Sequence, residues 1–119
     1  MGESYQLNVE LQPDEVMMRI KEGMTQRSEL LYEELNEVRN GRMIGTLIYE
    51  RFYFRSRNQA ALVIIVDNLL QGTVSNVPLI PAGASQGLIL KMDWGAGQSF
   101  ASTVEEILED YVVKYVCCE

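Results

Sequence analysis

Residues 44–70 read IGTLIYERFYFRSRNQAALVIIVDNLL, and they form the part of the chain richest in β-branched and aromatic residues. Such residues favour strands. The polar sequence Ser56-Arg57-Asn58 interrupts them and indicates a turn, so we expect an antiparallel pair of strands at residues 44–55 and 59–70. Asn40-Gly41, a strong hairpin signal, stands just before this pair. The stretch therefore predicts a fold built around an antiparallel sheet.

Both faces of this predicted hairpin are apolar. Successive side chains of a strand point to opposite sides, so Ile48 and Phe52 share one face of the first strand, and Leu47 and Tyr49 share the other. A sheet of five strands is about 24 Å wide at roughly 4.8 Å per strand, and two helices packed about 10 Å apart cover only one of its faces.

The second face then needs a cover, and the sequence is compatible with several candidates for it. A second subunit, the segment Ser28–Arg39, a small apolar ligand and strong curvature of the sheet would each serve. We expect a homodimer, and its candidate interface residues are Leu47, Tyr49, Tyr53, Val63 and Ile65.

The elements before the hairpin indicate a strand, a helix and one ambiguous segment. Residues 5–11 alternate apolar and polar side chains, as a strand with one buried face does. Pro13 followed by two acidic residues is typical of a helix start, and apolar residues recur every four positions to Met24. Ser28–Arg39 has helical spacing and a high Leu and Glu content, so we expect a helix, with a strand as the alternative.

The elements after the hairpin complete an α+β domain. A shorter strand begins at Gly72 and should stop at Pro78 and Pro81. Residues 87–94 alternate like another strand, and the apolar stripe of residues 100–115 predicts a helix of about four turns. Residues 1–119 are thus predicted as one domain: an antiparallel sheet of about five strands with an N-terminal helix and a longer C-terminal helix on one face. The expected order is β-α-(α or β)-β-β-β-β-α.

The composition of the chain indicates which classes of partner it can bind and in which cellular compartment it is expected. The formal net charge of -7 disfavours binding to nucleic acid and to anionic membranes. The longest apolar run, residues 60–66, is far shorter than the ~20 residues of a membrane-spanning helix, and the first residues do not resemble a secretory signal. The only cysteines, Cys117 and Cys118, are adjacent, which favours a reducing compartment. We expect a cytoplasmic protein with no nucleic-acid or membrane partner.

One motif resembles a catalytic site. Residues 83–87, GASQG, match the nucleophile elbow of hydrolases, but the chain contains no histidine to serve as the base. A tight glycine turn is the favoured interpretation. The alternative is a backbone nest that binds an anion or ligand, with candidate residues Gly83, Ser85, Gln86 and Gly87.

Other catalytic and metal signals are weak. Two adjacent thiols without histidine make a poor transition-metal site, so we expect no metal and no cofactor. Glu50 and Arg51 are a candidate buried polar pair. An enzyme would need these two side chains to converge with Ser85.

Five short motifs together resemble a known family: Asn40-Gly41, Tyr49-Glu50-Arg51-Phe52, Asn58, residues 83–87 (GASQG) and residues 91–95 (KMDWG). They are similar to short, mostly Gram-positive bacterial proteins classed only as a domain of unknown function, with a glycine-serine-glutamine loop before the last strand. The resemblance runs from the first strand to the final helix. It implies no activity, substrate or cofactor, and it implies less helix around residues 31–36.

The leading functional hypothesis is a non-enzymatic interaction or regulatory module that self-associates through its sheet. It rests on the doubly apolar hairpin and on the missing catalytic base. The alternative is a carrier or sensor of a small apolar ligand, in which the C-terminal helix encloses a cavity as in helix-grip folds. That alternative is an analogy between folds.

Overall fold

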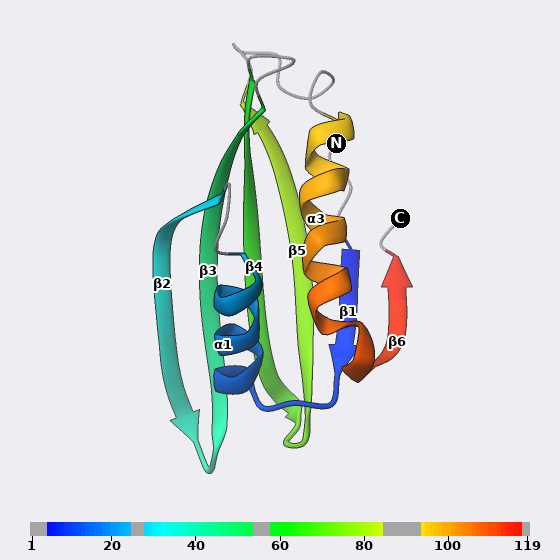
Figure 1. The fold of residues 1–119 in the computed structure, drawn as a ribbon. Helices are drawn as coiled ribbons and strands as arrows, with labels where there is room; N and C mark the ends of the chain where they lie inside the picture. Colours follow the sequence, from blue (N-terminus) through cyan, green and yellow to red (C-terminus); the bar gives the residue numbers. More distant parts are fainter. Residues whose placement is uncertain (1–4, 25–27, 54–57, 85–93, 118–119) are drawn as a thin grey trace.

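A computed structural model describes residues 5–24, 28–53, 58–84 and 94–117. The described strands form one antiparallel sheet in the order β2-β3-β4-β5-β1-β6 (Figure 1). They are β1 (Tyr5–Val9), β2 (Ser28–Arg39), β3 (Arg42–Tyr53), β4 (Asn58–Gln71), β5 (Val74–Ala84) and β6 (Val112–Cys117).

In the described ranges, two α-helices lie on the same face of this sheet. Helix α1 (Pro13–Gly23) packs over β3 and β4, and α3 (Trp94–Leu108) packs over β4 and β5 and against α1 (Figure 1). A short 3-10 helix, η1 (Glu109–Tyr111), joins α3 to β6. The predicted α+β class, the antiparallel sheet and the two helices on one face are confirmed, whereas the described sheet has six strands rather than about five.

The β2–β3 hairpin turns at Asn40-Gly41, as the sequence predicts. Both residues have positive φ, 50° and 80°, and Arg39 pairs with Arg42 across the turn. A two-residue turn with two positive φ angles matches the twist of its flanking strands, and asparagine and glycine adopt that backbone most readily.

The favoured helix at Ser28–Arg39 is wrong, and the alternative strand is correct. The segment forms β2, an edge strand paired along β3, and its pairing shifts register between Leu30 and Tyr32 and again between Glu37 and Arg39. These two irregularities disturb the period-2 alternation that would have indicated a strand.

The predicted C-terminal helix is wrong in its bounds. Helix α3 already begins at Trp94 and ends at Leu108, and the last part of the predicted helix forms η1 and β6 instead. Strand β6 pairs with β1, because Val112, Val113 and Val116 suit a strand and β1 offers it a partner. The strand predicted at residues 87–94 lies outside the described residues, except for Trp94.

Strand β5 continues through both prolines, so the stop predicted at Pro78 and Pro81 is also wrong. Pro78 lies opposite Gln6 of β1, and Pro81 lies opposite Leu62 of β4. Each residue in an antiparallel sheet directs its N–H toward only one of the two neighbouring strands. A proline therefore removes a single hydrogen bond, and the other hydrogen bonds between the strands persist.

The hydrophobic core lies between the helices and the sheet. The sheet contributes alternate residues of each central strand, which are fully buried: Leu7, Val9, Leu47, Leu62, Ile64, Val66, Val77 and Leu79. Against them pack Val16, Met17 and Ile20 of α1 and Ala101, Val104 and Leu108 of α3. Because both helices occupy this face, the opposite face of the sheet is left without a helix in the described part of the chain (Figure 1).

Candidate functional site

The face of the sheet turned away from α1 and α3, called the open face here, carries the candidate site. Residues directly opposite in the strand register share a face, so the pairing identifies its members. Ile48 lies opposite Val63, and Val63 lies opposite Ile80. This row crosses three neighbouring strands at the centre of the face.

The row is the middle of an apolar surface. Ile65 lies beside it on β4, opposite Thr46, and Ile44 lies farther along β3. The apolar centre of the open face is defined as Ile44, Ile48, Val63, Ile65 and Ile80. The side chain of Ile80 is 39% exposed, and the other four are half-buried by their neighbours in the sheet. The centre is thus apolar and accessible from one side.

Acidic residues of β2, β3 and β4 border the apolar centre. Glu50 lies on β3 opposite Ala61, beyond Ile48, and Asp67 lies opposite Ile44 at the other end of the hairpin. Glu29 and Glu34 lie on β2, opposite Glu50 and Thr46. An apolar centre with a charged rim is the usual arrangement of a protein-protein interface.

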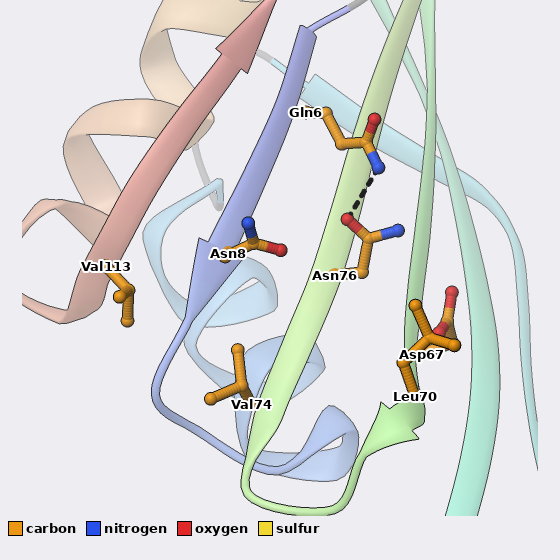
Figure 2. A pocket seen from close by; sticks show the side chains of 7 residues that line it. All are labelled: Gln6, Asn8, Asp67, Leu70, Val74, Asn76 and Val113. Atoms are coloured by element: carbon orange, nitrogen blue, oxygen red, sulfur yellow. Dashed lines mark hydrogen bonds between the residues drawn. The ribbon is translucent and has the colours of Figure 1, made fainter.

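A shallow hollow of about 430 Å³ with a mixed polar and apolar lining lies on the β1 side of the apolar centre. Figure 2 shows the side chains that line it. Its polar lining comes from Gln6 and Asn8 of β1, Asp67 of β4 and Asn76 of β5, and its apolar lining is Leu70, Val74 and Val113. Gln6 Nε2 donates a hydrogen bond of 2.7 Å to Asn76 Oδ1. The side chain of Asp67 accepts the Leu69 N–H at 3.1 Å. The hollow therefore presents amide and carboxylate groups to solvent.

The sequence contains part of the signal for this hollow. The wet face of the first strand is predicted by the alternation of residues 5–11, which includes Gln6 and Asn8. Asn76 and Asp67 join them through pairings across β5 and β4, where Asn76 lies opposite both Asn8 and Asp67. Such pairings depend on the register between distant strands.

The structure divides the predicted interface residues between two faces. Leu47 and Tyr49 are buried under the helices, where they lie opposite Ile64 and Leu62. Val63 and Ile65 belong to the open face.

The five predicted residues therefore do not form one surface, and that grouping is corrected. The odd-numbered residues of β3 pair with even-numbered residues of β4, a register that the sequence pattern does not specify. Tyr53 ends β3 opposite Asn58, and its side chain lies outside the described part.

The predicted buried pair of Glu50 and Arg51 is also corrected. Neighbours on a strand point to opposite faces, so Glu50 belongs to the open face and Arg51 to the helix side. Both side chains are only half-buried, and Arg51 Nε donates to Ser28 Oγ at 3.1 Å. The two groups do not converge as a catalytic pair would.

The predicted glycine loop is described only at its start. Gly83 lies in β5 opposite Ala60, whereas Ser85, Gln86 and Gly87 lie outside the described residues. The anion or ligand loop remains a prediction. Within the described ranges, no three cysteine and carboxylate side chains gather as metal ligands would.

Two tyrosines near the sheet have shifted pKa values. Burial raises the pKa of Tyr49, and the carboxylate of Glu33 adds to the shift. On the exposed surface of β2, the Tyr32 hydroxyl donates a 2.9 Å hydrogen bond to Glu34 Oε1, which raises the pKa of Tyr32. Asn36 Nδ2 donates to Glu34 Oε2 at 3.0 Å, and the Asn36 and Tyr32 hydrogen bonds together lower the pKa of Glu34.

A model of the family DUF6054, a family of unknown function, matches residues 3–112. The chain belongs to this family. The match begins before β1 and ends at the first residue of β6, so it includes both helices and the four strands between them. The predicted resemblance to a domain of unknown function is confirmed.

Comparison with curated proteins and with solved structures finds no significant match. The family match therefore brings no activity, ligand or partner to the open face. Among the described residues, no helix is both long enough and apolar enough to cross a membrane.

Proposed function

We propose that this chain is a non-enzymatic interaction module that self-associates by stacking the open faces of two copies. The observation that supports the proposal is the apolar centre of the open face, where Ile48, Val63 and Ile80 form a row that neither helix covers. A cytoplasmic location, expected from the two adjacent cysteines, belongs to the same proposal.

The size of the open face is sufficient for a stable dimer. Six strands spaced roughly 4.8 Å apart make a sheet about 29 Å wide. Four of them have 11–14 residues and are about 36–46 Å long, and β1 and β6 have 5 and 6 residues and are about 17–20 Å long. The face therefore measures roughly 1,000 Å², compared with about 800 Å² that each partner buries in a typical stable interface. Two such faces would stack about 10 Å apart, with the apolar centres in contact.

The acidic rim gives this association a characteristic salt dependence. Each copy carries a net charge of -7, and Glu50, Asp67, Glu29 and Glu34 lie on the face that would be shared. Repulsion between the two rims weakens at high salt, because the Debye length falls from about 10 Å at 0.1 M to about 3 Å at 1 M. Self-association should therefore become tighter as salt is added.

A charge in the apolar centre tests the proposal. In Ile80→Glu, a carboxylate would be desolvated in the interface, but in the monomer it remains in contact with water because position 80 is 39% exposed. We expect sedimentation velocity between about 1 and 100 µM to show a dimer for the wild type and at least a tenfold weaker association for this variant.

Met18→Glu is the matched control, since Met18 is 50% exposed on α1, on the other side of the sheet. This variant should dimerise like the wild type, and circular dichroism should show all three proteins folded. A wild type that remains monomeric at 100 µM in 1 M NaCl would contradict the proposal, as would equal loss of association in both variants.

The alternative hypothesis, a carrier of a small apolar ligand, receives less support from the described residues. The buried side chains between the helices and the sheet form one contiguous cluster that includes Leu47, Leu62, Val104 and Leu108. Native mass spectrometry of freshly purified protein tests the carrier directly. A co-purifying lipid-like mass would favour it over self-association.

A further inference from the structure

Strand β2 is an edge of the sheet, and no other described strand pairs with its outer side. It pairs with β3 along its whole length of 12 residues, and it ends the strand order of the described sheet. The outer side of such a strand directs unpaired N–H and C=O groups toward solvent, where another extended segment can pair with them. These backbone groups point sideways in the plane of the sheet, whereas the stacking surface proposed above is the open face, to which β2 contributes only the rim residues Glu29 and Glu34.

Hydrophobic side chains are concentrated on this edge. Ten large hydrophobic residues are exposed in the described part of the chain, and five of them belong to β2: Leu30, Leu31, Tyr32, Leu35 and Val38. Every residue of β2 after Ser28 is exposed. An exposed strand with this composition favours association with a further strand.

The regular part of the edge is six residues long. Register irregularities lie between Leu30 and Tyr32 and between Glu37 and Arg39, whereas residues 32–37 pair without interruption with residues 43–48 of β3. Bulges twist an edge and block its pairing. A partner strand therefore fits against residues 32–37.

The charges of β2 select the chemistry of the partner. The strand carries four glutamates and one arginine in its 12 residues. Glu33, Leu35 and Glu37 share the helix side of the strand. Their partners on β3 are Leu47, Gly45 and Met43, in that order, and Leu47 is buried under the helices. Glu33 forms a salt bridge with Lys21 of α1.

Glu34 lies on the opposite side of the strand and is held in place. Its two carboxylate oxygens accept hydrogen bonds from the Tyr32 hydroxyl and from Asn36 Nδ2. These bonds lower the pKa of Glu34, so the group is ionised at neutral pH. The edge thus presents the held carboxylate of Glu34 on one side, and on the other the carboxylate of Glu37 and that of Glu33, which is paired with Lys21.

We propose that residues 32–37 of β2 bind a basic, extended segment of another protein as an additional strand of the sheet. Lysine or arginine of the partner would lie opposite Glu33, Glu34 and Glu37, and an apolar residue would lie opposite Leu35. A second copy of β2 is a poorer occupant, because it would place four more glutamates against the first four. Charge complementarity therefore selects a basic partner.

A synthetic peptide tests the proposal on the intact protein. The core Lys-Thr-Val-Lys-Lys-Thr, running antiparallel to β2, places its lysines opposite Glu37, Glu34 and Glu33 and its valine opposite Leu35. A second peptide, Lys-Pro-Pro-Lys-Lys-Thr, keeps the charge but cannot pair fully, because each proline lacks an N–H and one of two adjacent residues must direct its N–H toward β2. Both are labelled with fluorescein, and binding is followed by fluorescence anisotropy at about 0.1 M salt.

Two protein variants with equal charge complete the experiment. Glu34→Lys combined with Glu37→Lys reverses two charges of the edge, and Glu106→Lys combined with Glu109→Lys reverses two exposed charges near the end of α3. The first peptide should bind the wild type and the α3 variant equally. It should bind the β2 variant at least tenfold more weakly, and the proline peptide should bind the wild type at least tenfold more weakly.

Three results would overturn the proposal. Equal affinity for the two peptides would mean that charge alone attracts them, without strand pairing. Equal binding by the β2 and α3 variants would mean that the peptide binds elsewhere. In the Ile80→Glu background, where stacking is blocked, a change in sedimentation on adding Glu34→Lys and Glu37→Lys would mean that a second copy occupies the edge. Ile80→Glu should retain peptide binding, so failure of the stacking proposal is distinguishable from failure of this one.

Discussion

Asn68 connects three turns at one end of the sheet, although its side chain is only 1% exposed. Its Nδ2 donates to Gln12 Oε1 at 3.2 Å and to the carbonyl oxygens of Gly41 at 3.3 Å and Gly72 at 3.1 Å. Its Oδ1 accepts the Met43 N–H at 2.7 Å. The amide thereby joins the loop before α1, the β2–β3 turn and the β4–β5 turn.

Asn68→Asp should destabilise the fold by about 2–3 kcal/mol, because a carboxylate has the same shape but donates no hydrogen bond to Gly41 and Gly72. Urea denaturation at pH 7 measures this loss. Asn40→Asp is the control, since Asn40 is exposed in the turn and aspartate also tolerates its positive φ. The control should change the free energy of unfolding by less than about 0.5 kcal/mol. Similar losses in both variants would show that the buried amide has no special role.

Tyr49 should make the fold sensitive to alkaline pH. Burial, followed by the charge of Glu33, raises its pKa above the ordinary value, which is about 10. Above pH 10 the unfolded chain therefore loses the Tyr49 proton before the folded chain does. The stabilisation is complete below the unfolded pKa and is lost as the pH rises through the folded pKa.

Urea denaturation at pH 9, 10 and 11 should therefore show a steeper loss of stability for the wild type than for Tyr49→Phe. Tyr32→Phe should follow the wild type more closely, since its hydroxyl is on the exposed surface, where solvent screens the interaction with Glu34. If Tyr49→Phe lost stability as steeply as the wild type, burial of this hydroxyl would not be the cause.

At the scale of elements, α1 approaches the sheet closely because of Gly45. A Cβ atom at this position of β3 would collide with Met17 Sδ and would lie 3.2 Å from the backbone oxygen of Glu34 and from Leu35 Cδ1. Glycine therefore permits both the contact with α1 and the pairing with β2.

Gly45→Val should destabilise the fold by about 1–3 kcal/mol through this overpacking, despite the better strand propensity of valine. Thr46→Val, the neighbouring change on the open face, should alter stability by less than about 0.5 kcal/mol. Thermal and urea denaturation of the two variants provide the comparison. A Gly45→Val protein as stable as the wild type would mean that α1 can shift without cost.

Local signals predicted several elements correctly, and β2 shows why one of them failed. Asn40-Gly41, Pro13 and the alternation of residues 5–11 act through their own backbone or their nearest neighbours, so the structure agrees with them. In β2, the apparent helical spacing comes from Leu31, Leu35 and Val38. Leu31 and Val38 lie at the two register irregularities, so the bulges mimic a helical period. The free edge of β3 then outweighs the helix propensity of a Leu- and Glu-rich segment.

At the scale of the whole molecule, the parts that could not be predicted depend on partners that are distant in the sequence. The apolar composition of residues 44–70 predicted an uncovered face. Which side chains lie on that face, Val63 but not Leu47, depends on the β3–β4 register. Residues 112–117 form a strand because β1, which pairs with β5 on one side, offers them its other side as a partner. The hollow beside the apolar centre depends on the strand register and on the position of β6, because its lining combines residues of β1, β4, β5 and β6.

The interior position of β1 in the sheet has a consequence for synthesis on the ribosome. Gln6 hydrogen-bonds a residue that follows it by 70 positions, and β1 lies between β5 and β6 in the finished sheet. At about 5–20 residues per second, the ribosome needs roughly 4–14 s to make that stretch. During this interval β2, β3 and β4 can pair with their neighbours as they emerge, whereas the first strand made has no partner. The oldest part of the nascent chain is therefore among the last to fold, and a chaperone would meet it first.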